Sequence, residues 1–279
     1  MIGRFGLNFR RLHILNYVVI GSFLISITAC ESKKANFLKA EAVQLAPPRI
    51  EVDSLLFNKT AHFKLFTGSN EANIRYTLDN SEVTSDSPIY TAPIVVSTTT
   101  HLKVKAFHPD FKTSEVVEGT IIQMKKDISG ASIAVQPEAH ENYKASGPNT
   151  LIDGRKGGVN FRNEARWLGF QTAETIINLD FSDSEPMEKV LVGLLQDHGS
   201  WIFLPDAIEV TTSGKSIGKL KLEPSENGES KKMGFTEVPI EKGVYDQITI
   251  TISALNGIPE WHPGKGTMPW TFVDEILIE

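Results

Sequence analysis

The chain has 279 residues, a formal net charge of −6 and a single cysteine, Cys30. This length suits one or two domains with real hydrophobic cores, and 41% hydrophobic and 22% charged residues are ordinary for a folded protein. Residues 1–29 hold three arginines and no acid, so removing them leaves 25 basic and 34 acidic residues, a net charge of −9. That acidity argues against nucleic acid and anionic lipid headgroups as partners, because both require a basic footprint. One cysteine excludes an intrachain disulfide and a cysteine-based zinc site.

The first thirty residues carry the features of an export signal. Three arginines precede an apolar run from Ile14 to Ile27, and the small residues Thr28 and Ala29 stand before Cys30. A basic start, an apolar middle and small residues before a cut are typical of a secretory signal peptide, here residues 1–29. A cysteine directly after the cut resembles the bacterial lipobox, whose diacylated thiol becomes a membrane anchor. The alternative is an uncleaved transmembrane anchor, since the run approaches the length of about 18 residues that such a helix needs.

Residues 30–46 are polar and rich in Ala and Lys, and Pro47-Pro48 closes them, which predicts a tether between lipid and fold. Glu31 rather than Asp follows Cys30. In Gram-negative lipoproteins this residue is compatible with passage to the outer membrane. We therefore expect a lipid-anchored protein of the cell envelope, at the outer membrane, on either its periplasmic or its surface face.

A first domain is predicted at residues 47–124. Apolar residues alternate with polar ones over residues 74–78 and 102–106, and clusters such as Asp79-Asn80-Ser81 provide turn chemistry between them. No stretch has the periodicity of an amphipathic helix. The pattern favours a small all-β sandwich of about 75 residues.

The segments YTLDNSEVTSDSPIY (76–90), API (92–94) and TTTHLKVKAF (98–107) resemble the small C-terminal module of chitobiase and β-N-acetylhexosaminidase enzymes. In that family the module is an accessory Ig-like domain. The resemblance therefore implies no catalytic residue in this part of the chain.

A second, longer domain is predicted at residues 128–279. Period-2 alternation recurs at residues 177–181, 190–194 and 248–252, separated by clusters of Gly, Pro, Asn and Ser. About 150 residues of such strands suit a jelly-roll sandwich. The predicted fold class is thus all-β, with two β-sandwich domains.

Five segments of this second domain resemble the discoidin-like, coagulation-factor type C domains, which have a galactose-binding-like fold. They are LIDG (151–154), RWLGF (166–170), ETIINLDF (174–181), LLQDHGSWIFLPDAIEV (194–210) and WHPGKGTMPWTFVDEI (261–276). That family largely binds carbohydrate, sometimes lipid or protein, and performs no chemistry. The resemblance implies a binding domain.

Two acids are candidates for a structural metal site. Asp153 lies in an Asp-Gly turn, and Glu275 lies beside Asp274 on the last predicted strand. Strand alternation places one of these two neighbours among apolar residues, where a carboxylate needs a partner such as a cation. The resemblance implies structural Ca²⁺ at Asp153 and Glu275, joined by main-chain carbonyls. Gly157-Gly158 departs from the commoner loop pattern, which often has a polar ligand there, and the alternative is two ordinary acids.

Loop residues with flat aromatic or polar side chains form a candidate carbohydrate site: Arg162, His198, Trp201, Trp261 and His262. Sugars stack their C–H faces on aromatic rings while polar groups hold the hydroxyls, and binding residues concentrate on loops. We expect Trp261 and His262 to be exposed. A zinc site is disfavoured, because the seven histidines include no His-x3-His pair.

The other tryptophans divide by position. Trp167 starts a predicted strand, so we expect it in the core. For Trp201 and Trp270 the sequence leaves two interpretations open, a plug that closes the end of the sandwich or an exposed platform.

The adjacent pair Asp274-Glu275 is the kind of carboxylate pair that hexosaminidases use in catalysis. That pair works in a (β/α)8 barrel, which needs about 250 residues with helices. Here two sandwiches occupy the chain from residue 47 onward, so the catalytic interpretation is rejected. The sequence has no Gly-x-Ser-x-Gly, phosphate-binding loop or Rossmann fingerprint either.

The sequence therefore predicts a non-catalytic lipoprotein that binds or positions a glycan of N-acetylhexosamine or galactose type. An alternative is a structural or adhesion module with a protein partner, and a weaker one is a fragment of a glycoside hydrolase or an enzyme with an unfamiliar site. Exposed loop aromatics beside polar groups would favour sugar, whereas a broad apolar patch would favour protein.

Overall fold

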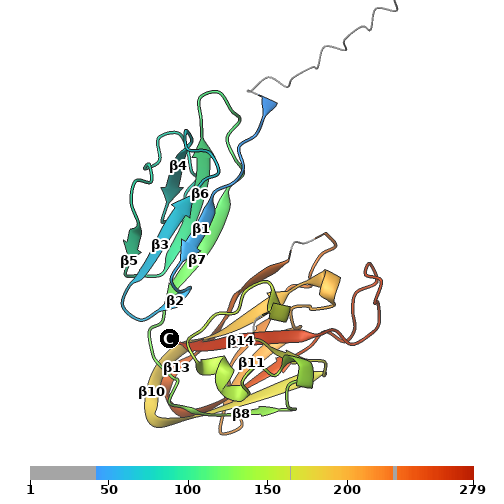
Figure 1. Ribbon diagram of the computed structural model, residues 1–279. Helices are drawn as coiled ribbons and strands as arrows, with labels where there is room; N and C mark the ends of the chain where they lie inside the picture. Colours follow the sequence, from blue (N-terminus) through green and yellow to red (C-terminus); the bar gives the residue numbers. More distant parts are fainter. Residues whose placement is uncertain (1–41, 164, 229–230) are drawn as a thin grey trace, which may run out of the picture. The chain divides into compact units, whose positions relative to one another are not determined.

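The computed structural model describes residues 42–163, 165–228 and 231–279. The predicted signal peptide and Cys30 lie outside these residues. Within them the chain consists of β-strands joined by loops and short 3-10 helices (Figure 1), which confirms the predicted all-β class. None of the helices described is both long and apolar enough to span a bilayer.

The first domain contains seven strands in two sheets. They are β1 (Arg49–Val52), β2 (Leu56–Phe57), β3 (Ala61–Phe66), β4 (Asn73–Thr77), β5 (Ile94–Val96), β6 (Thr100–Phe107) and β7 (Val117–Gln123). One sheet has the order β1-β3-β5 and the other β2-β7-β6-β4. Two small sheets of this kind form a sandwich.

Buried residues alternate with more exposed ones along β3 and β6, and this alternation determines how the two sheets pack. In β3 the residues Ala61, Phe63 and Leu65 are buried while the residues between them are exposed. In β6 the buried residues include Leu102 and Val104. Because side chains on a strand alternate between faces, one face of each sheet contributes to a shared core.

The second domain contains the remaining strands. They are β8 (Ser132–Gln136), β9 (Leu168–Phe170), β10 (Glu174–Gln196), β11 (Ala207–Thr212), β12 (Lys215–Lys221), β13 (Lys232–Ser253) and β14 (Thr271–Ile278). The 3-10 helices lie in the loops: η2 (Glu141–Tyr143), η3 (Pro148–Ile152), η4 (Phe161–Asn163) and η5 (His198–Ser200). The sheet order is β12-β11-β13-β10-β14-β9, and β8 pairs with β10.

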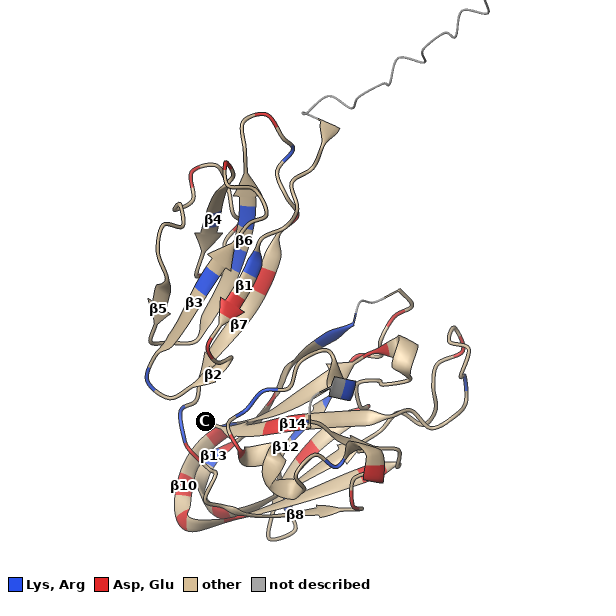
Figure 2. Cartoon of the chain, viewed as in Figure 1, with Lys and Arg blue, Asp and Glu red and all other residues tan. Residues whose placement is uncertain are grey.

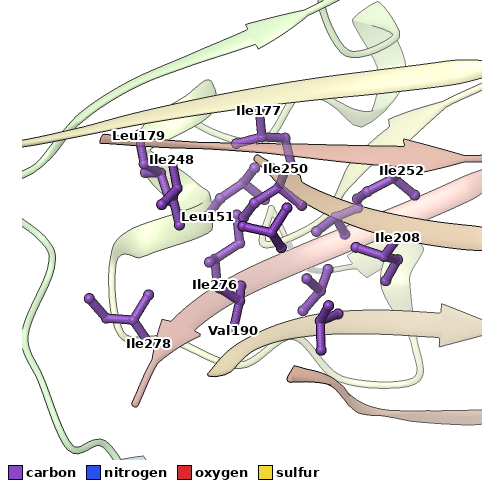
Figure 3. Packing of buried hydrophobic residues seen from close by; sticks show 14 of the residues in the cluster. Leu151, Ile177, Leu179, Val190, Ile208, Ile248, Ile250, Ile252, Ile276 and Ile278 are labelled. Carbon is purple, nitrogen blue, oxygen red and sulfur yellow. The ribbon is translucent and has the colours of Figure 1, made fainter. Parts of the chain in front are cut away.

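Two very long strands, β10 and β13, form both layers of this domain. They pair antiparallel along almost their whole length, with register shifts between Asp180 and Glu185 and between Met187 and Lys189. The strands bend at such irregularities, as Figure 1 shows for β10. Consequently Ile177 before the bend and Val190 after it belong to one buried cluster (Figure 3).

A β-bulge interrupts the last strand. Val192 of β10 pairs with Ile276 of β14, but Leu194 pairs with Val273, so β14 has one extra residue. Gly193 alone therefore faces two residues, Asp274 and Glu275. A bulge re-aims the side chains around it. All eight residues of β14 are buried, because both faces of this strand are covered.

Lysines and arginines are interspersed with acids over the strands and loops described (Figure 2). Neither domain is uniformly basic there.

Candidate functional site

An exposed tryptophan lies at the loop that follows β10. Asp197 and Ile202 close this loop by two backbone hydrogen bonds, of 3.0 and 3.1 Å between N and O. Within this loop Trp201 has a φ of 63°, in the left-handed region. Its backbone N–H donates to the carbonyl of His198 at 2.8 Å. Trp201 is 40% exposed, more than the other three tryptophans. A bulky residue rarely adopts this backbone conformation, and such strain concentrates at functional sites.

The ring of Trp201 is supported from one side. A Cβ placed on Gly264 would lie 3.1 Å from the six-membered ring, so this glycine allows the loop to pack directly against the indole. His262 stands edge-on to the same ring, with the two ring centroids 5.9 Å apart. The backbone carbonyl of Trp201 accepts a hydrogen bond from the backbone N–H of Trp270 at 2.9 Å. The indole is thus held in place while part of it faces solvent.

Polar side chains connect to each other next to Trp201. Arg162, which is exposed, donates from Nη2 to Ser200 Oγ at 3.2 Å. Ser200 donates to Asp197 Oδ2 at 2.8 Å, and Lys231 Nζ lies 2.9 Å from the same oxygen. Burial acts to raise the pKa of Asp197, but the hydrogen bonds from Lys231 and Ser200 outweigh it and lower that pKa below its usual value. The carboxylate is therefore ionised at neutral pH.

The predicted exposure of His262 is wrong, because this residue is only 8% exposed. Its Nδ1 accepts the N–H of Gly264 at 3.1 Å, and its Nε2 lies 3.0 Å from the carbonyl of His198. The backbone of its own loop and of the neighbouring one thus satisfies both ring nitrogens, which allows burial.

His198 and Trp261 are half-buried next to His262, so the expectation that Trp261 is exposed is wrong as well. His198 stacks on Phe203 with 4.6 Å between ring centroids, and the ring of Trp261 lies 5.0 Å from that of His198. The five predicted sugar-site residues therefore divide into an exposed group, Trp201 with Arg162, and an aromatic support beneath it.

A buried cluster lies under these loops. Its fully buried members are Phe161, Trp167, Leu195, Ile202 and Phe272. The prediction that Trp167 belongs to the core is confirmed, since it is 2% exposed. Trp270 is partly buried and packs edge-on against Tyr143 at 5.3 Å, so it serves as a plug more than as a platform.

The two predicted metal ligands lie at another part of this domain. The N–H of Arg155 donates to both Asp153 Oδ1, at 3.0 Å, and Glu275 Oε2, at 2.9 Å. Asp153 is exposed, whereas Glu275 is 1% exposed. Burial, together with the charges of Asp153 and Asp274, raises the pKa of Glu275 to about 8 against the backbone N–H donors of Arg155 and Gly154.

Both acids of the Asp274-Glu275 pair are buried, where alternation predicted only one. The bulge places both acids opposite Gly193, where the 153–158 loop covers them. Neither carboxylate is accessible to a substrate. The partner of Asp274 is Lys156, which no sequence pattern singles out. The only signal of this arrangement in the sequence is Gly193 inside a strand, since an isolated strand glycine often marks a bulge or a close approach.

Across residues 42–279, apart from 164 and 229–230, no group of three or more His, Cys, Asp or Glu side chains could hold a metal ion. The calcium ion expected at Asp153 and Glu275 stays a prediction.

Comparison with known families gives a match within the first domain. The model of the family described as chitobiase/beta-hexosaminidase C-terminal domain matches residues 54–118. This confirms the resemblance found in the motifs between residues 76 and 107. A search of curated proteins found no match to the chain.

Similar solved structures include carbohydrate-binding modules. One is chitosan-binding module 1 of a chitosanase/glucanase from Paenibacillus sp. IK-5, at 8% identity and a TM-score of 0.33, covering 55% of this chain and 98% of that one. A family 32 carbohydrate-binding module of Streptococcus pneumoniae EndoD has 7% identity, a TM-score of 0.38 and coverages of 55% and 97%. A GH29 fucosidase from Ruminococcus gnavus has 15% identity and a TM-score of 0.32, and this chain spans 26% of it while 55% of this chain is covered. With TM-scores below 0.5 they carry no inference about a ligand here.

Proposed function

We propose that the second domain binds carbohydrate at Trp201 and performs no chemistry on it. The observation that carries this proposal is an indole that is 40% exposed, supported from one side by Gly264 and His262, and held in a left-handed backbone conformation. A flat apolar ring of this kind suits the C–H face of a pyranose. Aromatic surface next to a few fixed polar groups is the usual composition of a small-ligand site.

The polar groups beside the ring supply the contacts that hydroxyls need. Arg162 offers several N–H donors in one plane, and Asp197 is an ionised acceptor. Ser200 is hydrogen-bonded to both side chains and so holds Arg162 and Asp197 next to each other. Because donors and an acceptor stand together, vicinal hydroxyls of an N-acetylhexosamine or a galactose-type sugar can be held while the ring stacks.

A glycan partner is favoured over a protein partner by the surroundings of Trp201. The residues connected around it are polar or charged: Arg162, Asp197, Ser200 and Lys231. A protein interface core instead depletes charged residues and gathers apolar ones.

The direct experiment is glycan-array binding by a soluble protein that begins at residue 31 and so lacks Cys30. We expect saturable binding to at least one glycan, displaced by the corresponding free sugar. Array-wide silence from a sample whose circular dichroism shows folded β-structure would move the assignment to a protein partner.

We further propose that the protein is anchored to the outer membrane by lipid on Cys30, with the first domain as a spacer. The support is sequence alone: three arginines, an apolar run and small residues before the only cysteine. Replacing Cys30 with serine in the full chain should shift the protein from the membrane fraction to the soluble or signal-bearing fraction and abolish metabolic labelling with palmitate. Unchanged palmitate labelling of Cys30→Ser would contradict the anchor.

A further inference from the structure

Lys156 and Asp274 form an ion pair in the interior of the second domain. Lys156 Nζ lies 2.7 Å from Asp274 Oδ1 and 2.6 Å from Oδ2. The two side chains are 6% and 0% exposed. Asp274 Oδ2 also accepts the backbone N–H of Gly157 at 2.7 Å. Both oxygens of this buried carboxylate are therefore partnered, which is the condition under which a buried charge is tolerated.

Aromatic rings surround the ammonium group. Lys156 Nζ lies 5.2 Å from the ring centroid of Trp167 and 4.6 Å from that of Phe235. A desolvated cation over such rings gains cation–π attraction in addition to its ion pair. Trp167 belongs to the cluster that includes Phe161 and Ile202. These two residues are chain neighbours of Arg162 and Trp201, so the ion pair and the candidate sugar site share one core.

The fold keeps a space open for this pair at Gly193. A Cβ at that position would overlap Asp274 Oδ1 and would lie 2.9 Å from Lys156 Nζ. The bulge of β14 and the missing side chain opposite it thus leave room for one ammonium and one carboxylate.

The groups around Asp153 and Glu275 do not fit an oxygen-ligated divalent cation. Calcium takes six to eight oxygen ligands. Here the loop of residues 153–158 instead directs backbone N–H groups at the two buried acids, from Arg155 to Glu275 and from Gly157 to Asp274. Those N–H dipoles present their positive ends to the acids, and the charge of Lys156 acts mainly on Asp274 and less on Glu275. The carboxylate oxygens that would ligate a cation instead accept hydrogen bonds from the backbone of this loop.

We propose that the ammonium group of Lys156 replaces the metal ion that the family resemblance implies, tying the 153–158 loop to β14 so that the domain folds without calcium. The electrostatics of the pair agree with this. Burial lowers the pKa of Lys156 and raises the pKa of Asp274, and their mutual attraction opposes both shifts. Each group is thus tolerated in the interior only in the presence of the other.

The first test needs no substitution. All four tryptophans lie after residue 160, so tryptophan fluorescence follows the unfolding of the second domain selectively. We expect its melting temperature to change by less than about 1 °C between EDTA and millimolar calcium, because nothing binds the native state to shift the equilibrium. A melting temperature that falls in EDTA and recovers with calcium would overturn the proposal.

The second test separates charge from packing. Lys156→Met should lower the melting temperature by about 10 °C, because it leaves Asp274 buried and unpaired. The matched control is Lys215→Met, which removes an ion pair to Glu241 at 2.9 Å whose side chains are 69% and 60% exposed; it should shift the midpoint by less than about 2 °C.

The double variant Lys156→Met/Asp274→Leu completes the test. It replaces the whole pair by apolar groups and should recover at least half of the lost melting temperature. Equal losses in the single and double variants would contradict the proposal, since they would assign the effect to the lysine stem. So would a Lys156→Met protein as stable as the parent. If Lys156→Met does not fold, the melting temperatures in EDTA and calcium and that of the double variant still decide whether Lys156 takes the place of a metal ion.

Discussion

Replacing Gly193 with alanine is expected to destabilise the second domain by about 3 kcal/mol or more. The added Cβ overlaps Asp274 Oδ1, which lies in a fully buried ion pair and cannot move toward solvent. Either the pair separates, leaving charges unpartnered in the interior, or the bulge of β14 is lost. Denaturant unfolding followed by tryptophan fluorescence measures this loss.

Gly234→Ala is the matched control for Gly193→Ala. Gly234 lies on β13, paired with Leu194 one residue away from Gly193, and a Cβ there meets nothing within 4 Å. Its substitution should change the free energy of unfolding by less than about 1 kcal/mol, because alanine costs nothing sterically and restricts the unfolded chain. Similar losses for the two variants would show that Gly193 is not kept small for the ion pair.

Replacing Trp201 with alanine should raise the Kd for a bound glycan at least about 30-fold, since an anchoring aromatic commonly contributes 2 kcal/mol or more. The fold should survive, because the residue is 40% exposed. Isothermal titration with the best glycan from the array gives the ratio of the two Kd values.

Phe66→Ala is the control for this loss of an exposed ring. Phe66 has the same 40% exposure as Trp201 but lies on β3 of the first domain. Its removal should leave the Kd unchanged. Equal losses for Phe66→Ala and Trp201→Ala would argue that binding depends on exposed aromatic surface in general and not on the site at Trp201.

The strands were predictable where one face is buried. Period-2 alternation at residues 102–106 and 177–181 appears in the structure as inward-facing Leu102, Val104, Ile177 and Leu179. The length of β10, 23 residues, was not evident, because the strand bends at irregular positions between Asp180 and Lys189 that interrupt the pattern. Local periodicity describes one layer of the sandwich at a time and does not reveal a strand that runs through both layers.

The site was predictable in composition but not in exposure. Trp201 and His262 both lie in Gly-containing loops, and the sequence gives no means to tell which one faces solvent. The difference arises from backbone contacts far apart in the chain: the pairing of Asp197 with Ile202 turns Trp201 outward, while the carbonyl of His198 meets the ring of His262. Such contacts form only in the folded state.

Lys156 escaped prediction for a related reason. A lysine between an arginine and two glycines is usually a solvated turn residue. Its burial depends on Asp274, which lies 118 positions later, and on a bulge that brings that acid inward. No local sequence pattern indicates the distant acid or the bulge.

The most direct test of the carbohydrate site is a titration of ¹⁵N-labelled protein with the best glycan, followed at the four tryptophan indole N–H signals. Trp167 provides an internal reference, because its Nε1 donates to the carbonyl of Gly158 at 3.0 Å inside the core. We expect the Trp201 signal to move most and to saturate with the Kd of binding, while the Trp167 signal stays in place. A bound glycan that leaves the Trp201 signal unmoved would place the site elsewhere and contradict the account.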